Sequence, residues 1–262
     1  MAKENHITTK GFILRIVNYR ENNLILDILT ADYGLITCSY SGRKSKNNSL
    51  RRSISPFIFA EFKLFYYRNR YSLNSLDIIE SFSPLMEDLE RLTCLSHLSE
   101  LVMDILRHQP KASNVYPFWA YSSYCIVYQK DPILTTHLSQ LKFISDQGFS
   151  PWIEDCLICH KPIKTNIVNF YLNRGGVICD APACRKHTAE SSIVLLHRTN
   201  IDLISYLLKL PYEKCFNLDV EHHLRAELLA FSKRYVNTVM EKEYKKLDIL
   251  STMEKFEKGI YE

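Results

Sequence analysis

Residues 23–41, NLILDILTADYGLITCSYS, decide the fold of the N-terminal part of this chain. They hold two runs rich in apolar and β-branched residues, separated by the turn residues Asp32, Tyr33 and Gly34. Runs of this composition on either side of a short turn are typical of β-strands. The stretch therefore predicts two strands joined tightly.

Three further segments of the same kind surround this pair, at residues 6–17, 54–67 and 71–80. Five short strands with tight turns in about 80 residues fit a small closed β-barrel of the OB type. The face and loops of such barrels commonly bind single-stranded nucleic acid. We expect residues 1–80 to form a nucleic-acid-binding OB domain.

From residue 81 onward the sequence predicts helices. Ser83 and Pro84 are typical of a helix start, and the apolar residues that follow recur with a period near 3.6. Further helical patterns cover about 115–129, 131–148, 200–210 and 221–250. The predicted fold class is therefore α+β, with the five-stranded OB-type barrel followed by a helical domain at 81–262.

Four of the eight cysteines form two close pairs within this helical domain, Cys156-x2-Cys159 and Cys179-x4-Cys184. This spacing is close to that at which four thiolates hold zinc tetrahedrally. Four protein ligands leave no coordination position for water, so the predicted cofactor is a structural zinc, in a module inserted at about 151–190.

The second pair has a longer spacer than the usual two residues, which makes His160 and His187 alternative ligands. The competing interpretation is that the four cysteines are buried thiols without a metal. The remaining cysteines are interpreted as small apolar residues: Cys38, Cys94, Cys125 and Cys215.

No motif in the chain indicates catalysis. The seven glycines form no P-loop, and neither a Gly-x-Ser-x-Gly elbow nor a His-Glu-x-x-His helix occurs. His222 and His223 are adjacent on a predicted helix and so point to different faces, which favours surface or packing roles. We therefore expect that the protein is not an enzyme. Because the sequence shows no membrane-length apolar run and no signal peptide, we expect the protein in the cytoplasm, where thiols stay reduced.

Positive charge is concentrated in the first 80 residues, which carry 12 Lys and Arg against 7 Asp and Glu. Residues 43–70 hold eight of these basic side chains and the single acid Glu61. Such a cluster suggests a polyanionic partner. Five tyrosines of residues 1–80 are candidate stacking platforms: Tyr19, Tyr40, Tyr66, Tyr67 and Tyr71. Arg51 and Arg52 are expected on the same loop as Arg43, Lys44 and Lys46, which Asn47, Asn48 and Ser49 make flexible. The alternatives are that this basic loop is only a solvated surface and that the tyrosines fill the barrel core.

Several stretches resemble the RecO family of bacterial DNA repair and recombination mediators. They are TKGFILRIVNYRENNLILDILTADYGLITCSYSGRKSKNNSL, HLSQLKFISDQGFSPWIEDCLICH, YLNRGGVICDAPAC and SKRYVNTVMEKEYKKLDIL, and they cover nearly the whole chain in the family's order. The resemblance implies an OB barrel on a helical domain with a zinc module. It also implies binding of single- and double-stranded DNA, strand annealing, and RecA loading at the nucleoid with RecR and the tail of the single-stranded DNA-binding protein.

The DNA-binding residues are predicted at two levels. The Gly-Arg-Lys loop that matches the family gives Arg43, Lys44 and Lys46. Charge alone adds Lys10, Arg15, Arg20, Arg51, Arg52, Arg68 and Arg70. The metal ligands are predicted to be Cys156, Cys159, Cys179 and Cys184. Alternative functions are an RNA-binding OB protein, a zinc-stapled protein-interaction scaffold and a zinc-dependent enzyme.

Overall fold

The computed structural model describes residues 5–20, 22–42, 48–109, 114–186, 192–216 and 218–250. The chain forms two compact units, one made of residues 1–95 with 99–116 and the other of residues 96–98 with 117–262. Within the described ranges, no helix is long and apolar enough to span a membrane. The predicted α+β fold class is confirmed.

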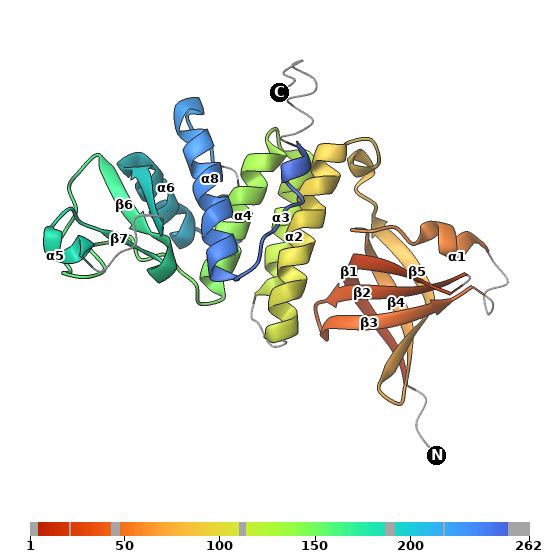
Figure 1. Ribbon diagram of the computed structural model, residues 1–262. Helices are drawn as coiled ribbons and strands as arrows, with labels where there is room; N and C mark the ends of the chain where they lie inside the picture. Colours follow the sequence, from red (N-terminus) through yellow and green to blue (C-terminus); the bar gives the residue numbers. More distant parts are fainter. Residues whose placement is uncertain are drawn as a thin grey trace. The chain divides into compact units, whose positions relative to one another are not determined.

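The first unit contains a closed five-stranded barrel in the order β1-β2-β3-β5-β4 (Figure 1). Its strands are β1 (Asn5–Tyr19), β2 (Asn23–Thr30), β3 (Gly34–Ser41), β4 (Phe59–Tyr67) and β5 (Arg70–Glu80). Neighbouring strands are antiparallel except β3 and β5, which pair in parallel over Cys38–Tyr71 and Ser39–Ser72. The predicted OB-type barrel is therefore confirmed.

The long strand β1 closes the barrel because it pairs with two neighbours. Residues 5–12 pair with β4 and residues 11–19 pair with β2, with an irregular register between Ile13 and Arg15. At the overlap, a Cβ on Gly11 would lie 2.6 Å from the Leu29 carbonyl oxygen. The close approach of the two backbones therefore requires glycine at this position. Apolar side chains such as Ile13, Leu26 and Phe62 fill the barrel core.

Two predictions about helices in the first unit are wrong. Arg51 and Arg52, expected on a flexible loop, lie in the short helix α1 (Asn48–Ser53) between β3 and β4. The helix expected from Ser83 is interrupted: a 3-10 turn η1 (Ser83–Met86) precedes α2 (Leu89–His108). The side chain of Asp88 accepts a hydrogen bond from the Arg91 N–H at 3.0 Å, so the regular helix starts at this cap.

The second unit combines helices with a small antiparallel sheet. Its helices are α3 (Val115–Tyr128), α4 (Pro132–Asp146), α5 (Pro182–Arg185), α6 (Arg198–Lys209), α7 (Tyr212–Cys215) and α8 (His222–Val239), with a 3-10 turn η2 (Leu172–Arg174). The strands are β6 (Ile167–Tyr171), β7 (Gly176–Ile178) and β8 (Ile193–His197), in the order β7-β6-β8. The sequence did not predict this sheet. It also predicted a longer last helix, whereas α8 ends at Val239, shortly before Glu241 with its left-handed φ of 49°.

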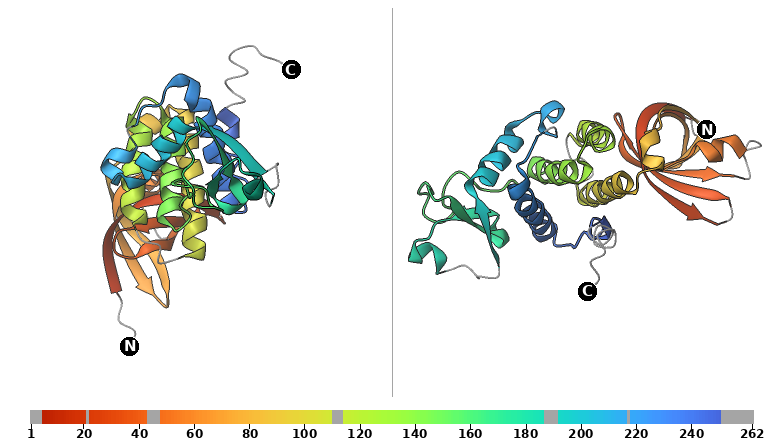
Figure 2. Two further views of the ribbon diagram at one scale, coloured as in Figure 1. Left: turned by 90° about the vertical axis from the view of Figure 1, so that its left-hand side faces the viewer. Right: turned by 90° about the horizontal axis from the view of Figure 1, so that it is seen from above.

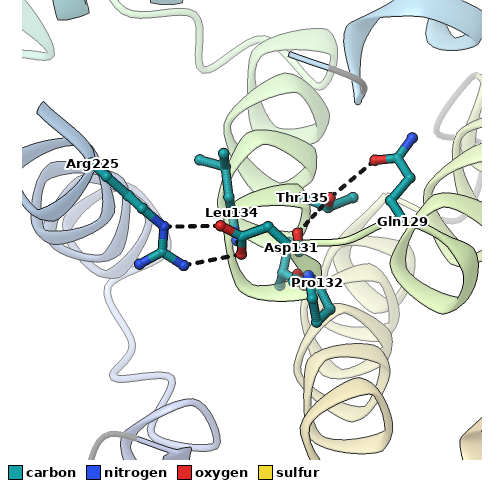
Figure 3. Close-up of polar contacts among 7 residues, drawn as sticks. Gln129, Asp131, Pro132, Leu134, Thr135 and Arg225 are labelled. Atoms are coloured by element: carbon teal, nitrogen blue, oxygen red, sulfur yellow. Dashed lines mark hydrogen bonds and ion pairs between the residues drawn. The ribbon is translucent and has the colours of Figure 1, made fainter. Parts of the chain in front are cut away.

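Helices α4 and α8 lie side by side, as expected for helical segments on either side of the cysteine module (Figure 2). Arg225 of α8 makes two charged hydrogen bonds to Asp131, whose side chain also caps α4 through the Leu134 N–H (Figure 3). Deeper in the interface, Gln140 of α4 donates to the Ser232 hydroxyl of α8 at 2.7 Å. Polar contacts thus fix the register between the two helices.

Candidate metal centre and nucleic-acid interface

The four paired cysteines meet at one end of the small sheet. Cys156 and Cys159 lie in a turn closed by the His160 N–H to Cys156 carbonyl hydrogen bond, and the Leu157 N–H ties that turn to Val177 of β7 at 2.8 Å. Cys179 directly follows β7, and Cys184 lies in α5. Strand β7 therefore holds both cysteine pairs in place.

The sulfur arrangement fits a tetrahedral metal. All four Sγ atoms lie within 4.8 Å of one another, and the Sγ atoms of Cys159 and Cys179 are 3.7 Å apart. Four sulfurs at about 2.3 Å from a zinc ion would be separated by about 3.8 Å. The four thiols could therefore hold a metal ion after only small shifts of the sulfurs. Such a four-thiolate shell leaves no ligand position open for chemistry.

The electrostatics of the cluster also favour a cation. Burial by itself raises the pKa of the Cys156 thiol, but the N–H groups of Cys159, Cys179 and Ile158 lower that pKa to about 6. In contrast, the hydrogen bond with Cys179 and burial raise the pKa of Cys184 to about 12, with further contributions from Cys159 and Cys156. Four crowded sulfurs thus resist complete ionisation alone, and a bound divalent cation would make the thiolates favourable.

Of the two alternative histidine ligands, the structure describes His160. The exposed ring of His160 faces Asp155, with the Nδ1 and Oδ1 atoms 3.4 Å apart, and His160 is not part of the cluster. His187 lies outside the described residues. The other four cysteines form no disulfide and lie outside this cluster. His222 and His223 are both exposed on α8, in agreement with a surface role.

A groove of about 660 Å³ lies on the barrel, beside the short parallel pairing of β3 and β5. Its lining combines rings, hydroxyls, an amide and one cation: Ser39, Tyr40, Ser41, Leu50, Phe65, Tyr67, Arg70, Ser72, Leu73 and Asn74. Flat rings and a guanidinium in one groove can contact bases and phosphates together. The sequence did not predict which strands would form it.

Two of the barrel's hairpin turns carry the same side-chain pair. In the β1–β2 turn the Arg20 guanidinium lies 5.2 Å from the ring centroid of Tyr19, and in the β4–β5 turn Arg68 lies at the same distance from Tyr67. Tyr19 is 48% exposed and Tyr67 is 40% exposed. Each pair therefore presents a ring and a positive charge to solvent, which suits stacking on a base beside a phosphate.

Other candidate tyrosines have structural roles. The ring of Tyr40 is buried in the barrel core, although the residue also lines the groove. Tyr66 and Tyr71 are half-buried and pack on each other with ring centroids 4.8 Å apart. The interpretation of the tyrosines as core residues therefore holds for part of the set.

The predicted DNA-binding lysines and arginines differ in exposure and in their ion-pair partners. Arg43, Lys44 and Lys46 lie outside the described residues, but Ser41 and Leu50 on either side of that loop both line the groove. Arg15 binds the buried Asp27, with Nε 2.7 Å from Oδ2. The exposed residues are Lys10, Arg15, Arg20, Arg52, Arg68 and Arg70, while Arg51 is half-buried. All ten remain predictions.

The fold and its cysteine cluster define a protein with an OB-type barrel, a helical unit and a candidate structural metal centre. Residues 1–84 match the family model described as Recombination protein O N terminal, and residues 86–248 match Recombination protein O C terminal. The chain therefore belongs to the recombination protein O family, a family of DNA repair proteins.

Individual relatives agree with this assignment over nearly the full length. The DNA repair protein RecO of Acetivibrio thermocellus is 25% identical over 252 residues, covering 96% of this chain and 98% of the relative. The RecO proteins of a Thermoanaerobacter species and of Caldicellulosiruptor bescii are 24% and 26% identical, covering 95% and 92% of this chain and 98% and 96% of the respective relatives.

Proposed function

We propose that this chain is a non-enzymatic DNA-binding protein of recombinational repair, and that single-stranded DNA lies in the groove beside β3 and β5. The observation that carries the proposal is the Tyr–Arg pair repeated at the β1–β2 and β4–β5 hairpin turns, of which Tyr67 also lines the groove. Exposed rings stack on bases of any sequence, and the adjacent cations neutralise phosphates.

The family membership extends this proposal to the protein's cellular role. The chain would bind single- and double-stranded DNA, anneal complementary strands and assist RecA loading at the nucleoid, in the bacterial cytoplasm. RecR and the acidic tail of the single-stranded DNA-binding protein would be its partners. The cysteine cluster would hold a structural zinc, which folds the module around it and does no chemistry.

The test is a salt titration of binding to a fluorescently labelled single strand of DNA, beside an RNA of the same sequence. Each stacked base contributes about 1–3 kcal/mol, so Tyr19→Ala and Tyr67→Ala should each weaken the Kd about tenfold at every salt concentration. Arg70→Ala should instead reduce the slope of log K against log salt by about 0.7, the value for one phosphate contact on a single strand.

Tyr33→Ala is the matched control, because Tyr33 is 47% exposed but its β2–β3 turn, Ala31-Asp32-Tyr33, has no arginine beside the ring and does not line the groove. That variant should bind like the wild type. Equal losses in Tyr33→Ala and Tyr67→Ala would reject the groove as the site. A clear preference for RNA would instead favour an RNA-binding OB protein, and no binding to either strand would favour a protein-interaction scaffold.

A further inference from the structure

The four clustered cysteines differ in exposure. Cys156 and Cys184 are 0% and 2% exposed and pack against Tyr171 and Ile178, whereas Cys159 and Cys179 are partly exposed. Each cysteine pair of the sequence therefore contributes one buried and one partly exposed cysteine. A dissolved oxidant reaches the accessible sulfurs first.

The two accessible sulfurs are also close to each other. The Sγ atoms of Cys159 and Cys179 are 3.7 Å apart, although the residues are 20 positions apart in sequence. Cys156 is held differently, because its sulfur accepts a hydrogen bond from the Cys179 N–H at 3.3 Å. The accessible sulfur of one turn thus has the accessible sulfur of the other turn as a direct neighbour.

We propose that Cys159 and Cys179 form an oxidation site, at which a peroxide converts the two thiolates into a disulfide and the metal is released. The metal-release part rests on the proposed zinc occupancy, whereas the choice of cysteines rests on the exposure and distance of the sulfurs. The reaction needs no group beyond the peroxide and the two cysteines.

The chemistry balances in two steps. One thiolate sulfur attacks the O–O bond of hydrogen peroxide, which forms an S–O bond and expels hydroxide, leaving a sulfenic acid. The second thiolate attacks that sulfur, the S–S bond forms, the S–O bond breaks and a second hydroxide leaves. Two protons from solvent convert both hydroxides to water. The sulfurs lose two electrons in total, and the peroxide gains them.

The disulfide would remove two of the four metal ligands. Cys156 and Cys184 would remain, and two thiolates are too few for the closed four-ligand shell of a structural zinc site. Release of one zinc ion per disulfide follows. Reduction by dithiothreitol in the presence of zinc would restore the four-thiolate site.

The experiment uses the full reduced chain, whose zinc content is first counted by mass spectrometry. Hydrogen peroxide is then titrated in, released zinc is measured with a chromogenic chelator, and free thiols are alkylated before non-reducing peptide mapping. The expected result is a dominant Cys159–Cys179 linkage with one zinc released per disulfide. Dominant Cys156–Cys159 or Cys179–Cys184 linkage, irreversible oxidation without a disulfide, or an unreactive cluster would each overturn the proposal.

Cys125→Ser is the control, because Cys125 is also partly exposed but lies on α3 outside the cluster. This variant should release zinc and form the same disulfide as the wild type, and loss of either signal would assign the oxidation to another site. A reduced chain without zinc would refute the zinc occupancy, while the disulfide map would still decide which cysteines react.

Discussion

At the scale of single residues, Arg68 has a backbone conformation that favours glycine. Arg68 and Asn69 have φ angles of 47° and 62°, as the two central residues of a type I′ hairpin turn require. Asparagine tolerates this region well, whereas an arginine there costs roughly 1 kcal/mol. A strained residue in a candidate binding turn supports the hypothesis that its side chain has a functional role.

Arg68→Gly is therefore expected to have opposite effects on folding and binding. The free energy of unfolding should rise by up to about 1 kcal/mol as the strain is removed, while affinity for single-stranded DNA should fall several-fold. Urea unfolding and fluorescence anisotropy measure the two effects. Asn69→Gly changes the same turn without removing a guanidinium, so it should bind DNA like the wild type. Lower stability together with unchanged binding in Arg68→Gly would contradict the prediction.

His137 is a buried histidine whose protonation opposes folding. Burial, together with the positive charges of His97, Arg225 and Lys233, lowers its pKa to about 3, against a smaller opposite effect of Asp131. Its Nδ1 accepts a hydrogen bond from the Gln140 amide, whose oxygen accepts from the His97 Nε2–H. An extra proton on Nδ1 would break this chain of donors and acceptors.

The sign of the pH effect follows from the lowered pKa. Above the unfolded pKa of about 6.5 both states carry a neutral ring, and between about 6.5 and 3 only the unfolded state binds the proton. Stability is thus fully present above pH 6.5 and falls below it, by up to about 1.4 kcal/mol per pH unit. Urea midpoints from pH 7.5 to 5 should decline less steeply in His137→Gln than in His222→Gln, a variant of an exposed histidine. Equal slopes would exclude His137 as the cause.

The residue scale also shows why only part of the candidate site could be predicted. The candidate metal ligands could be found because Cys156 and Cys159 share one turn, and a sequence spacing reports such local geometry directly. The Tyr–Arg pairs depend on left-handed turn residues, which composition does not reveal for an arginine. The basic residues could be counted, but not the pairing of Arg15 with the buried Asp27.

At the scale of elements, Asp131 connects the start of α4 to α8. Its Oδ1 accepts from the Leu134 N–H at 2.8 Å, and Arg225 binds both carboxylate oxygens (Figure 3). Burial alone would raise the pKa of Asp131, but Arg225 and the Leu134 N–H hold that pKa below its ordinary value. One side chain thus serves as a helix cap and as an ion-pair partner.

Substitutions of Asp131 and Arg225 should separate the helix-cap role of Asp131 from its role in the ion pair. Asp131→Ala loses both and should cost about 1–2 kcal/mol of unfolding free energy, while Asp131→Asn keeps a good cap and should cost roughly 0.5 kcal/mol. Arg225→Ala removes only the half-exposed ion pair and should resemble Asp131→Asn. Chemical denaturation measures all three. An Asp131→Asn variant as unstable as Asp131→Ala would show that the cap contributes nothing.

Element types could be predicted where local patterns are strong. The barrel strands, α3, α4 and α6 follow apolar periodicity and turn residues. The sheet of β6, β7 and β8 escaped prediction because these strands have only three to five residues, and β8 reaches β6 from beyond α5. Likewise, α1 has six residues, too few for a periodic signal.

At the scale of the whole molecule, the barrel and the cysteine module have separate cores. The barrel core is made of residues from β1 to β5 with the nearby Ile54 and Ile58, and the module core contains Cys156, Tyr171, Ile178 and Cys184. The domain boundary expected at residues 80 and 81 stays a prediction about independent folding.

Metal removal should therefore affect one core and spare the other. Replacing Cys156 and Cys159 by serine should abolish zinc binding and lower solubility, because a structural metal contributes directly to folding. Affinity of the remaining soluble protein for single-stranded DNA should change less than twofold. Metal analysis, sedimentation and anisotropy check these outcomes. Full zinc content in this variant would refute the centre, and a large loss of DNA affinity would refute the separation of the two roles.

The double pairing of β1 has a consequence for synthesis on the ribosome. Its second half can pair with β2 as soon as residue 30 has emerged, but its first half must wait for β4, which ends at residue 67. For more than thirty residues of translation, this half is an open strand edge that another nascent chain can join. The polar run Thr8, Thr9 and Lys10 occupies this edge, and a charged side chain there discourages pairing between neighbouring nascent chains.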